Sequence, residues 1–208
     1  MPVLDCSVKI GQAGLVARTK EFDPDAAVDA AMRVFWARGY EATSVEDLLG
    51  ALGIGRQSMY ATFGSKQQLY SLALDRYREL NASMLLASLA EDGPVLPKLH
   101  GLLRAVADDA LADPERRGCF LVNAAMERVP VDTATAGRVG ATFEALEEGI
   151  ASAITRAQAS GEITSGRPAG ELAAFVLTAV QGLRVVGKAA PDRRRLEGAV
   201  RVVLDVLR

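Results

Sequence analysis

Residues 43–69 have the sequence TSVEDLLGALGIGRQSMYATFGSKQQL, which predicts two short helices joined by a glycine turn. Overlapping capping boxes at Thr43 and Ser44, each followed three positions later by an acidic residue, begin the first helix. Gly53 ends this helix, and the turn leads directly into a second helix over residues 56–63. Two short helices in this arrangement are typical of a helix-turn-helix unit.

Helical periodicity extends on both sides of this stretch. Upstream, Asp23 precedes a proline at the start of a helix that ends at Gly39. Downstream, Ser65 caps a long helix, and further amphipathic helices follow to the C-terminus. The sequence therefore predicts an all-α fold, with an N-terminal three-helix helix-turn-helix domain, a larger C-terminal helical bundle and about nine helices in total. The expected divisions are a mobile N-terminal arm (1–21), the helix-turn-helix domain (22–66) and a ligand-binding and dimerisation domain (67–208).

Composition narrows the classes of protein that the chain can belong to. With 208 residues, half of them hydrophobic, and a formal charge of −2, the chain is expected to fold as one domain, or as a small domain joined to a larger one. Two cysteines and one histidine favour neither a disulfide framework nor a zinc site nor a catalytic triad. We expect no metal, no cofactor and no membrane partner, because apolar runs are short, and we expect a cytoplasmic location.

The distribution of charge is more informative than its total. No acidic residue occurs from Leu48 to Leu74, whereas Arg56 and Lys66 lie in this window. Two basic side chains are a modest electrostatic footprint for DNA. A dimer would double it, and Arg18 and Lys20 on the N-terminal arm would add to it.

The start of the second short helix has side chains that suit DNA. Arginine pairs with guanine, glutamine with adenine, and serine with either base, while a glycine lets the backbone come close. Hydroxyls and a lysine at helix N-termini suit phosphate oxygens. The predicted DNA-binding residues are Thr43, Ser44, Gly55, Arg56, Gln57, Ser58, Tyr60, Ser65 and Lys66.

Four segments together resemble the TetR/AcrR family of ligand-responsive transcriptional regulators: FWARGY (35–40), TSV (43–45), LGI (52–54) and YATFGSKQQL (60–69). The resemblance covers about residues 22–70. The segment RGCFLVNAAME (117–127) is similar to one subset of the family. This resemblance implies a homodimer that binds double-stranded operator DNA through its N-terminal domain and an inducing ligand through its C-terminal domain.

The expected ligand site is a mostly apolar cavity between C-terminal helices, which favours a small hydrophobic or aromatic effector. Cys119 follows two arginines at a predicted helix N-terminus, an environment that can favour a reactive thiol. A buried, unreactive cysteine is the alternative. The candidate ligand residues are Phe120, Asn123, Met126, Glu127, Phe143, Phe175 and Gln181.

The last two predicted helices carry more apolar residues than one core needs, and small residues between them permit close approach. We therefore expect a four-helix dimer interface. The predicted interface residues are Phe175, Ala179, Leu183, Val186, Leu196, Val200, Val203 and Leu207.

Together these patterns predict a sequence-specific DNA-binding regulator, a repressor that a small-molecule effector releases from its operator. The alternative is a helical redox or small-molecule-binding protein that senses through Cys119 without specific DNA readout. An enzyme ranks third, because the sequence has one histidine and no phosphate-binding loop.

Overall fold

The computed structural model describes residues 22–208, and within this range every regular element is a helix. The predicted all-α fold is confirmed. Nine helices are present in this range when α4, η1 and α5, which are continuous, are counted as one. The bounds are α1 (Pro24–Arg38), α2 (Val45–Leu52), α3 (Arg56–Phe63), α4 (Lys66–Arg78), η1 (Glu79–Ser83), α5 (Met84–Ala90), α6 (Val95–Ala112), α7 (Phe120–Glu127), α8 (Thr133–Ala159), α9 (Ala169–Ala189) and α10 (Arg193–Val206). The predicted arm, with Arg18 and Lys20, lies outside the described residues.

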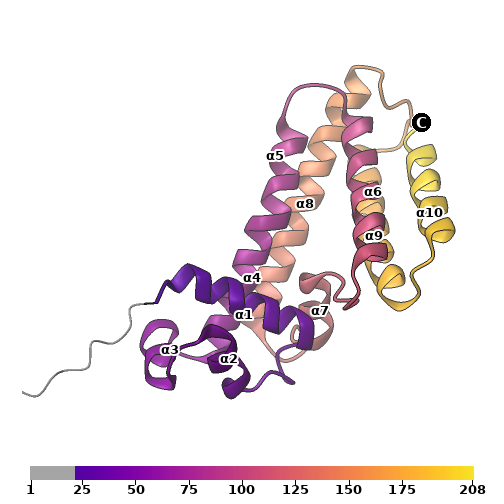
Figure 1. Ribbon diagram of the computed structural model, residues 1–208. Helices are drawn as coiled ribbons and strands as arrows, with labels where there is room; N and C mark the ends of the chain where they lie inside the picture. The colour runs from indigo at the N-terminus through magenta and orange to yellow at the C-terminus, as the bar shows by residue number, and fades with distance from the viewer. Residues whose placement is uncertain (1–21) are drawn as a thin grey trace, which may run out of the picture.

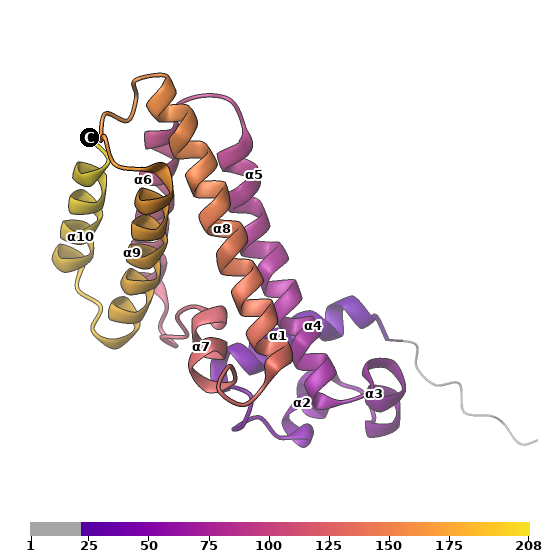
Figure 2. The same cartoon turned by 180° about the vertical axis from the view of Figure 1, so that it is seen from behind.

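Helices α1–α3 cluster at one end of the molecule, and a bundle rises from them (Figure 1). The continuous helix α4–α5 runs beside α8, while α6 and α9 lie next to this pair and α10 is outermost. Seen from behind, α7 lies at the base of the bundle, against the α1–α3 cluster (Figure 2). The short helix α7 is therefore the part of the C-terminal region placed to contact the N-terminal helices.

The molecule has two hydrophobic cores. The larger one is formed by α5, α6, α8, α9 and α10. The smaller one joins α1–α3 to α4 and to α7, and includes Phe35, Leu48, Met59, Tyr70 and Phe120. The predicted domain boundary at residues 66 and 67 falls at the first turn of α4. This helix belongs to the smaller core, whereas its continuation through η1 and α5 belongs to the larger one.

Helix starts follow the capping residues that the sequence indicates. Asp23, Ser44, Ser65 and Asp192 each accept a hydrogen bond from a backbone N–H of the first turn of their helix. Ser44 and Asp47 form a complete capping box.

The continuous helix α4–α5 contains one departure from the predicted regular helix. Residues 79–83 make a π-helical turn, and the side-chain amide of Asn81 donates to the Tyr77 carbonyl at 2.8 Å. Such a turn widens a helix locally and often marks a functional region. Here it faces the cavities described below.

Helix α9 is, within residues 22–208, the one helix long and apolar enough to cross a membrane by length and composition. The sequence did not indicate such a segment. Its buried residues, among them Leu172, Val176, Val180 and Leu183, belong to the larger core. This packing accounts for the buried apolar residues of α9, whereas Phe175, Val185 and Val186 are exposed.

Thr43 does not form the second predicted capping box, and its predicted contact with DNA is corrected. The side chain is fully buried (0% exposed), and its hydroxyl donates to the Gly39 carbonyl at 2.6 Å. Thr43 therefore closes the turn between α1 and α2 from inside the small core, where no phosphate can reach it.

We expect Thr43→Val to lower the free energy of unfolding by about 1–3 kcal/mol, because the substitution leaves the Gly39 carbonyl without its donor. Thr43→Ser keeps the hydroxyl and should cost less. Urea denaturation measures both. If Thr43→Val kept full stability but lost affinity for DNA, Thr43 would be a DNA contact after all.

Candidate functional site

The N-terminal half of α3 is the exposed part of the helix-turn-helix unit. Met59 and Phe63 are buried in the small core and fix the orientation of α3. The opposite face therefore points outward, with Gly55, Arg56 and Gln57 exposed. Ser58 is half-buried, and Tyr60 is exposed at 40%. The five residues predicted on this helix and its N-cap thus lie together.

Backbone geometry prepares this helix for an anionic partner. Gly53 ends α2 in the left-handed region, at a φ of 66° that favours glycine. Gly55 is the N-cap of α3, and no side chain caps the helix. The first N–H groups of α3 are therefore available to a phosphate oxygen, to which the helix dipole also contributes.

Acidic side chains of α2 pair with the nearest arginines. Arg56 forms an ion pair with Glu46, and both side chains are more than half exposed. Arg38 donates to Asp47 at 2.6 Å. Hydrogen bonds from the Ser44 hydroxyl and N–H, together with Arg38, lower the pKa of Asp47 to about 2. The carboxylate of Asp47 is therefore ionised at neutral pH, and DNA would have to compete with Glu46 for Arg56.

The remaining predicted phosphate contacts have intramolecular roles. The hydroxyls of Ser44 and Ser65 cap α2 and α4. The ammonium of Lys66 lies 4.2 Å from the centre of the Tyr40 ring, a cation–π distance. Lys66 is half-buried, so its ammonium is held close to the protein surface.

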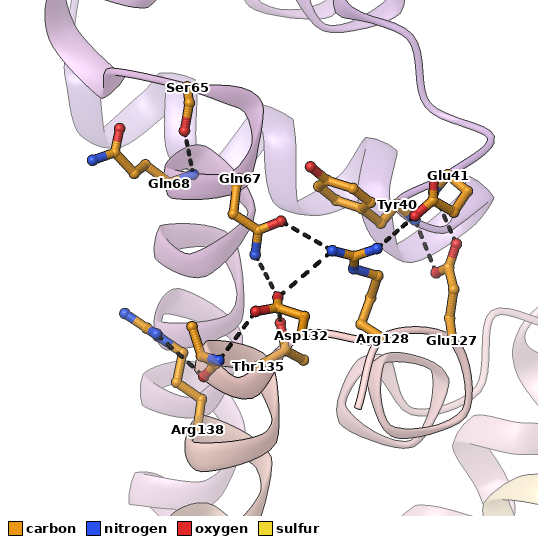
Figure 3. Close-up of polar contacts among 11 residues, drawn as sticks. Tyr40, Glu41, Ser65, Gln67, Gln68, Glu127, Arg128, Asp132, Thr135 and Arg138 are labelled. Atoms are coloured by element: carbon orange, nitrogen blue, oxygen red, sulfur yellow. Dashed lines mark hydrogen bonds and ion pairs between the residues drawn. The ribbon is translucent and has the colours of Figure 1, made fainter. Parts of the chain in front are cut away.

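A polar network joins the α1–α2 turn to the end of α7 (Figure 3). The two carboxylate oxygens of Glu127 accept from the backbone N–H groups of Tyr40 and Glu41, each at 2.9 Å. Gly39 has a φ of 84°, and a Cβ there would lie 2.8 Å from a Glu127 oxygen. Glu127 was predicted to bind ligand, and this prediction is corrected because both of its oxygens bind the N-terminal domain.

Arg128 extends the same network (Figure 3). Its guanidinium pairs with Glu41 at 2.5 Å, donates to the side-chain oxygen of Gln67 at 3.3 Å and lies over the Tyr40 ring at 4.2 Å. Gln67 also donates to Asp132 at 2.5 Å. We define the Glu127–Arg128 clamp as these two residues and their partners Tyr40, Glu41, Gln67 and Asp132.

A second contact joins α1 to the loop before α7. The Trp36 indole N–H donates to the Gly118 carbonyl at 2.9 Å, and the Arg117 guanidinium lies 4.5 Å from the centre of a Trp36 ring. Trp36, Arg117 and Gly118 also line the outer of the two cavities described next, so α1 and this loop share a cavity wall.

Two of the cavities in the C-terminal bundle adjoin each other. The outer one, of about 360 Å³, lies between the Trp36 side chain and the ends of α6 and α9. The inner one, of about 170 Å³, is enclosed by η1, α5, α6, α8 and α9. Five residues line both: Tyr77, Asn81, Val106, Asp109 and Arg184.

Only part of the predicted ligand set lines these cavities. Phe143 and Gln181 line the inner one. Phe120 is corrected to a core residue, because its ring packs edge-on against Tyr70 and Tyr77. Met126 is 79% exposed, and it is corrected to a surface residue.

The other two predicted ligand residues lie outside the cavity walls. Asn123 donates to the Arg117 carbonyl at 2.9 Å and accepts from Lys188 at 3.1 Å, so it holds the rim of the outer cavity. Phe175 is exposed on the outer face of α9.

Cys119 is buried at 3% exposure, and the Arg184 guanidinium donates to its sulfur at 3.1 Å. Sequence reasoning missed Tyr77, Asn81, Asp109 and Arg184 as cavity residues. A signal for Arg184 was present, since it is the single charged residue in the apolar stretch 172–187. Within residues 22–208, no cluster of three or more His, Cys, Asp or Glu side chains is placed to hold a metal.

The predicted dimer interface is corrected for five of its residues. These are buried in the core of the single chain and have no surface to offer a partner: Leu183, Leu196, Val200, Val203 and Leu207. Phe175 and Val186 are exposed and Ala179 is half-buried. The α9–α10 face, as we define it, consists of the outward residues Phe175, Thr178, Gly182 and Val185 on α9 and Ala199 and Val202 on α10.

Two family descriptions match the chain. "Bacterial regulatory proteins, tetR family" matches residues 27–73, and "Tetracyclin repressor-like, C-terminal domain" matches residues 95–203. Among named relatives, the HTH-type transcriptional regulator YezE of Bacillus subtilis (strain 168) is 33% identical over 194 residues, which is 92% of this chain and 100% of YezE. The HTH-type transcriptional repressor ComR of Escherichia coli (strain K12) is 32% identical over 180 residues, which is 86% of each chain.

Solved structures show the same arrangement. The TetR family regulator CifR, as a cysteine mutant in complex with a 26-base-pair operator, superposes with a TM-score of 0.81 at 31% identity, covering 92% of this chain and 100% of that one. The reduced form of NemR from E. coli shares the fold, with a TM-score of 0.81 at 14% identity. With both halves matched and close relatives aligned along most of its length, the chain belongs to the TetR family of DNA-binding transcriptional regulators.

Proposed function

We propose that this regulator is a repressor that binds double-stranded operator DNA as a homodimer and leaves it when a small effector binds the C-terminal domain. The observation that carries the proposal is the exposed N-terminal half of α3, where Arg56 and Gln57 point away from the core. The relative CifR is solved on operator DNA, and ComR is named a repressor. We place this regulator in the cytoplasm, because the chromosomal DNA that it would bind is located there.

The readout has a defined chemistry. Arg56, Gln57 and Ser58 occupy the first turn of α3 and would face base edges in the major groove. The uncapped N–H groups of this turn and the Tyr60 hydroxyl would bind phosphates. These contacts position the helix, while the base contacts supply the sequence preference.

The α9–α10 face supports a homodimer. It exposes Phe175, Val185 and Val202 at 40%, 50% and 60%. These residues lie on α9 and α10, two neighbouring helices at the side of the molecule (Figure 1). Gly182 lies between them, and a Cβ there would meet nothing within 4 Å in the chain itself. Such a surface fits a second copy across a two-fold axis, which also sets the spacing of the two α3 helices.

Effector release follows from the position of the cavities. The outer cavity is bounded by the α6–α7 loop, whose Gly118 carbonyl accepts from Trp36 of α1. A ligand that binds better when this loop has moved would shift the population toward a different spacing of the α3 helices. Apolar residues of the inner cavity suit a small hydrophobic or aromatic effector.

The second candidate function is sensing through Cys119 without specific DNA readout. The hydrogen bond from Arg184 to the sulfur favours it, because a guanidinium stabilises a thiolate. The burial of the sulfur opposes it. Alkylation of the native protein by iodoacetamide at neutral pH distinguishes a reactive thiol from a buried one.

The DNA-binding proposal is tested by gel shift with the DNA upstream of the gene. We expect a specific, salt-sensitive shift, and Arg56→Ala should weaken binding by about 1–3 kcal/mol if Arg56 contacts a base. Arg104→Ala, an exposed change on α6, is the matched control. A shift that any DNA reproduces equally would contradict specific readout.

Glu46→Gln should strengthen DNA binding about two- to fivefold, because it releases Arg56 and removes a negative charge beside the DNA-facing helix. Glu144→Gln on the exposed face of α8 changes the net charge equally and should have little effect. A lower affinity of Glu46→Gln would show instead that the ion pair orients Arg56.

Gly182→Leu should disrupt the dimer without destabilising the single chain. In the monomer the added side chain meets open space, whereas in the proposed dimer it would clash with the second copy. Light scattering after size exclusion should show a monomer, and operator affinity should fall with it. Gly101→Leu on α6, also in open space, is the control. If Gly182→Leu remained a dimer, the interface would not include the α9–α10 face around Gly182.

A further inference from the structure

The two cavities meet at the Arg184 side chain. Arg184 lies on α9, and it lines both the outer and the inner cavity. One of its guanidinium nitrogens, Nη1, donates to Cys119 at 3.1 Å. A ligand bound across the junction would therefore have one end in each cavity and Arg184 between them.

The charge of Arg184 has no anionic partner within residues 22–208. Asp113, an acidic residue of the outer cavity wall, already forms an ion pair with Arg117 at 3.5 Å. Asp109, which is exposed, lines both cavities, and its charge acts on Arg184, but the two side chains form no ion pair. Burial raises the pKa of the Tyr77 hydroxyl, so this phenol is neutral at pH 7 and supplies no counter-charge. A partly buried cation without an anion carries a desolvation cost that a bound anion would offset.

The walls of the outer cavity reinforce this positive charge. Arg116, Arg117, Arg184 and Lys188 line it against two acidic residues, one of which is already paired. The ammonium of Lys188 donates to the Arg117 carbonyl and the Asn123 side chain, each at 3.1 Å, and so is fixed at the rim. The outer cavity is therefore positively charged.

The inner cavity has the opposite character. Its walls are mainly aliphatic and aromatic, with Leu102, Phe143, Ile150 and Leu177 among them. Apart from the polar residues that it shares with the outer cavity, this wall has one further polar side chain, Gln181, whose buried side-chain oxygen has no hydrogen-bond partner within the described residues. A buried acceptor without a donor is costly, and a ligand hydroxyl or N–H would satisfy it.

We infer that the effector is a small organic acid, whose carboxylate binds Arg184 at the junction and whose apolar body, with a hydrogen-bond donor toward Gln181, fills the inner cavity. This inference rests on the proposed effector-released repressor and adds to it the chemical class of the effector. Guanidinium and carboxylate match in shape as well as charge, since two parallel hydrogen bonds join them.

The test uses phenylacetate, 3-phenylpropanoate, 4-phenylbutanoate and their 4-hydroxyphenyl forms, each paired with its primary amide. The amide has the same shape without the charge. Calorimetric titration of the intact protein should show at least one acid binding about 10- to 100-fold more tightly than its amide. The hydroxylated member of that pair should bind more tightly than the plain one. Equal binding of acids and amides, or no binding by any, would overturn the inference.

Arg184→Met removes the charge and keeps most of the apolar stem. We expect it to abolish the preference for acid over amide without lowering the melting temperature of the free protein, because no ion pair is lost. Arg193→Met, an exposed arginine on α10, is the control and should keep the preference. If Arg184→Met fails to fold, Arg184→Gln takes its place. If the variant without Arg184 still bound the acid more tightly than the amide, the inference would be overturned.

Gel shift separates this inference from the proposed function. Without added compound, the wild-type protein should retard its upstream DNA, and the tightest acid should release it, whereas its amide should not. If the protein binds its upstream DNA and no acid releases it, the proposal of DNA binding stands and the inference of an organic-acid effector is overturned. Cys119→Ser should keep the acid response, and loss of that response with Arg184 intact would assign the site to the thiol instead.

Discussion

The contact between one carboxylate and two backbone N–H groups fixes how the two halves of this molecule sit together. Glu127, at the end of α7, accepts from Tyr40 and Glu41 in the turn that leads from α1 to α2. The glycine at 39 makes this approach feasible, because any larger residue would clash with the carboxylate. The helix-turn-helix unit is therefore oriented by α7 as much as by α4, and charge-assisted hydrogen bonds make that orientation specific.

The clamp also explains how a cavity can influence a distant DNA-facing helix. The loop before α7 forms a wall of the outer cavity and binds Trp36, while the end of α7 binds the α1–α2 turn. A short helix of eight residues thus contacts the N-terminal domain at both of its ends. A displacement of α7 must move α1 or break one of these contacts. Two discrete arrangements of such an element are what ligand-linked switching requires.

Local patterns predicted the elements well because caps and glycines act over a few residues. The bounds of α1 and α2 follow from Asp23, Gly39 and Gly53, and the predicted second short helix over residues 56–63 matches α3. The roles of single side chains were harder to predict from the sequence. Apolar residues such as Phe120 and Leu196 fit a core, a cavity wall and a subunit interface equally well. Only tertiary packing separates these cases. Thr43 shows the same limit, because a threonine before a helix suits a cap, a phosphate or a buried turn equally.

Charge illustrates how the sequence total and the local arrangement answer different questions. The net charge of −2 opposes DNA, and the acid-free window from Leu48 to Leu74 favours it. The structure adds that Glu46, just outside this window, folds back onto Arg56. The basic side chain best placed to bind DNA is thus already partly neutralised in the free protein. Non-specific attraction is weakened by this pair, whereas a guanine that offers two acceptors can still displace the carboxylate. Specificity would then come from the competition between Glu46 and a base, and not from the number of positive charges.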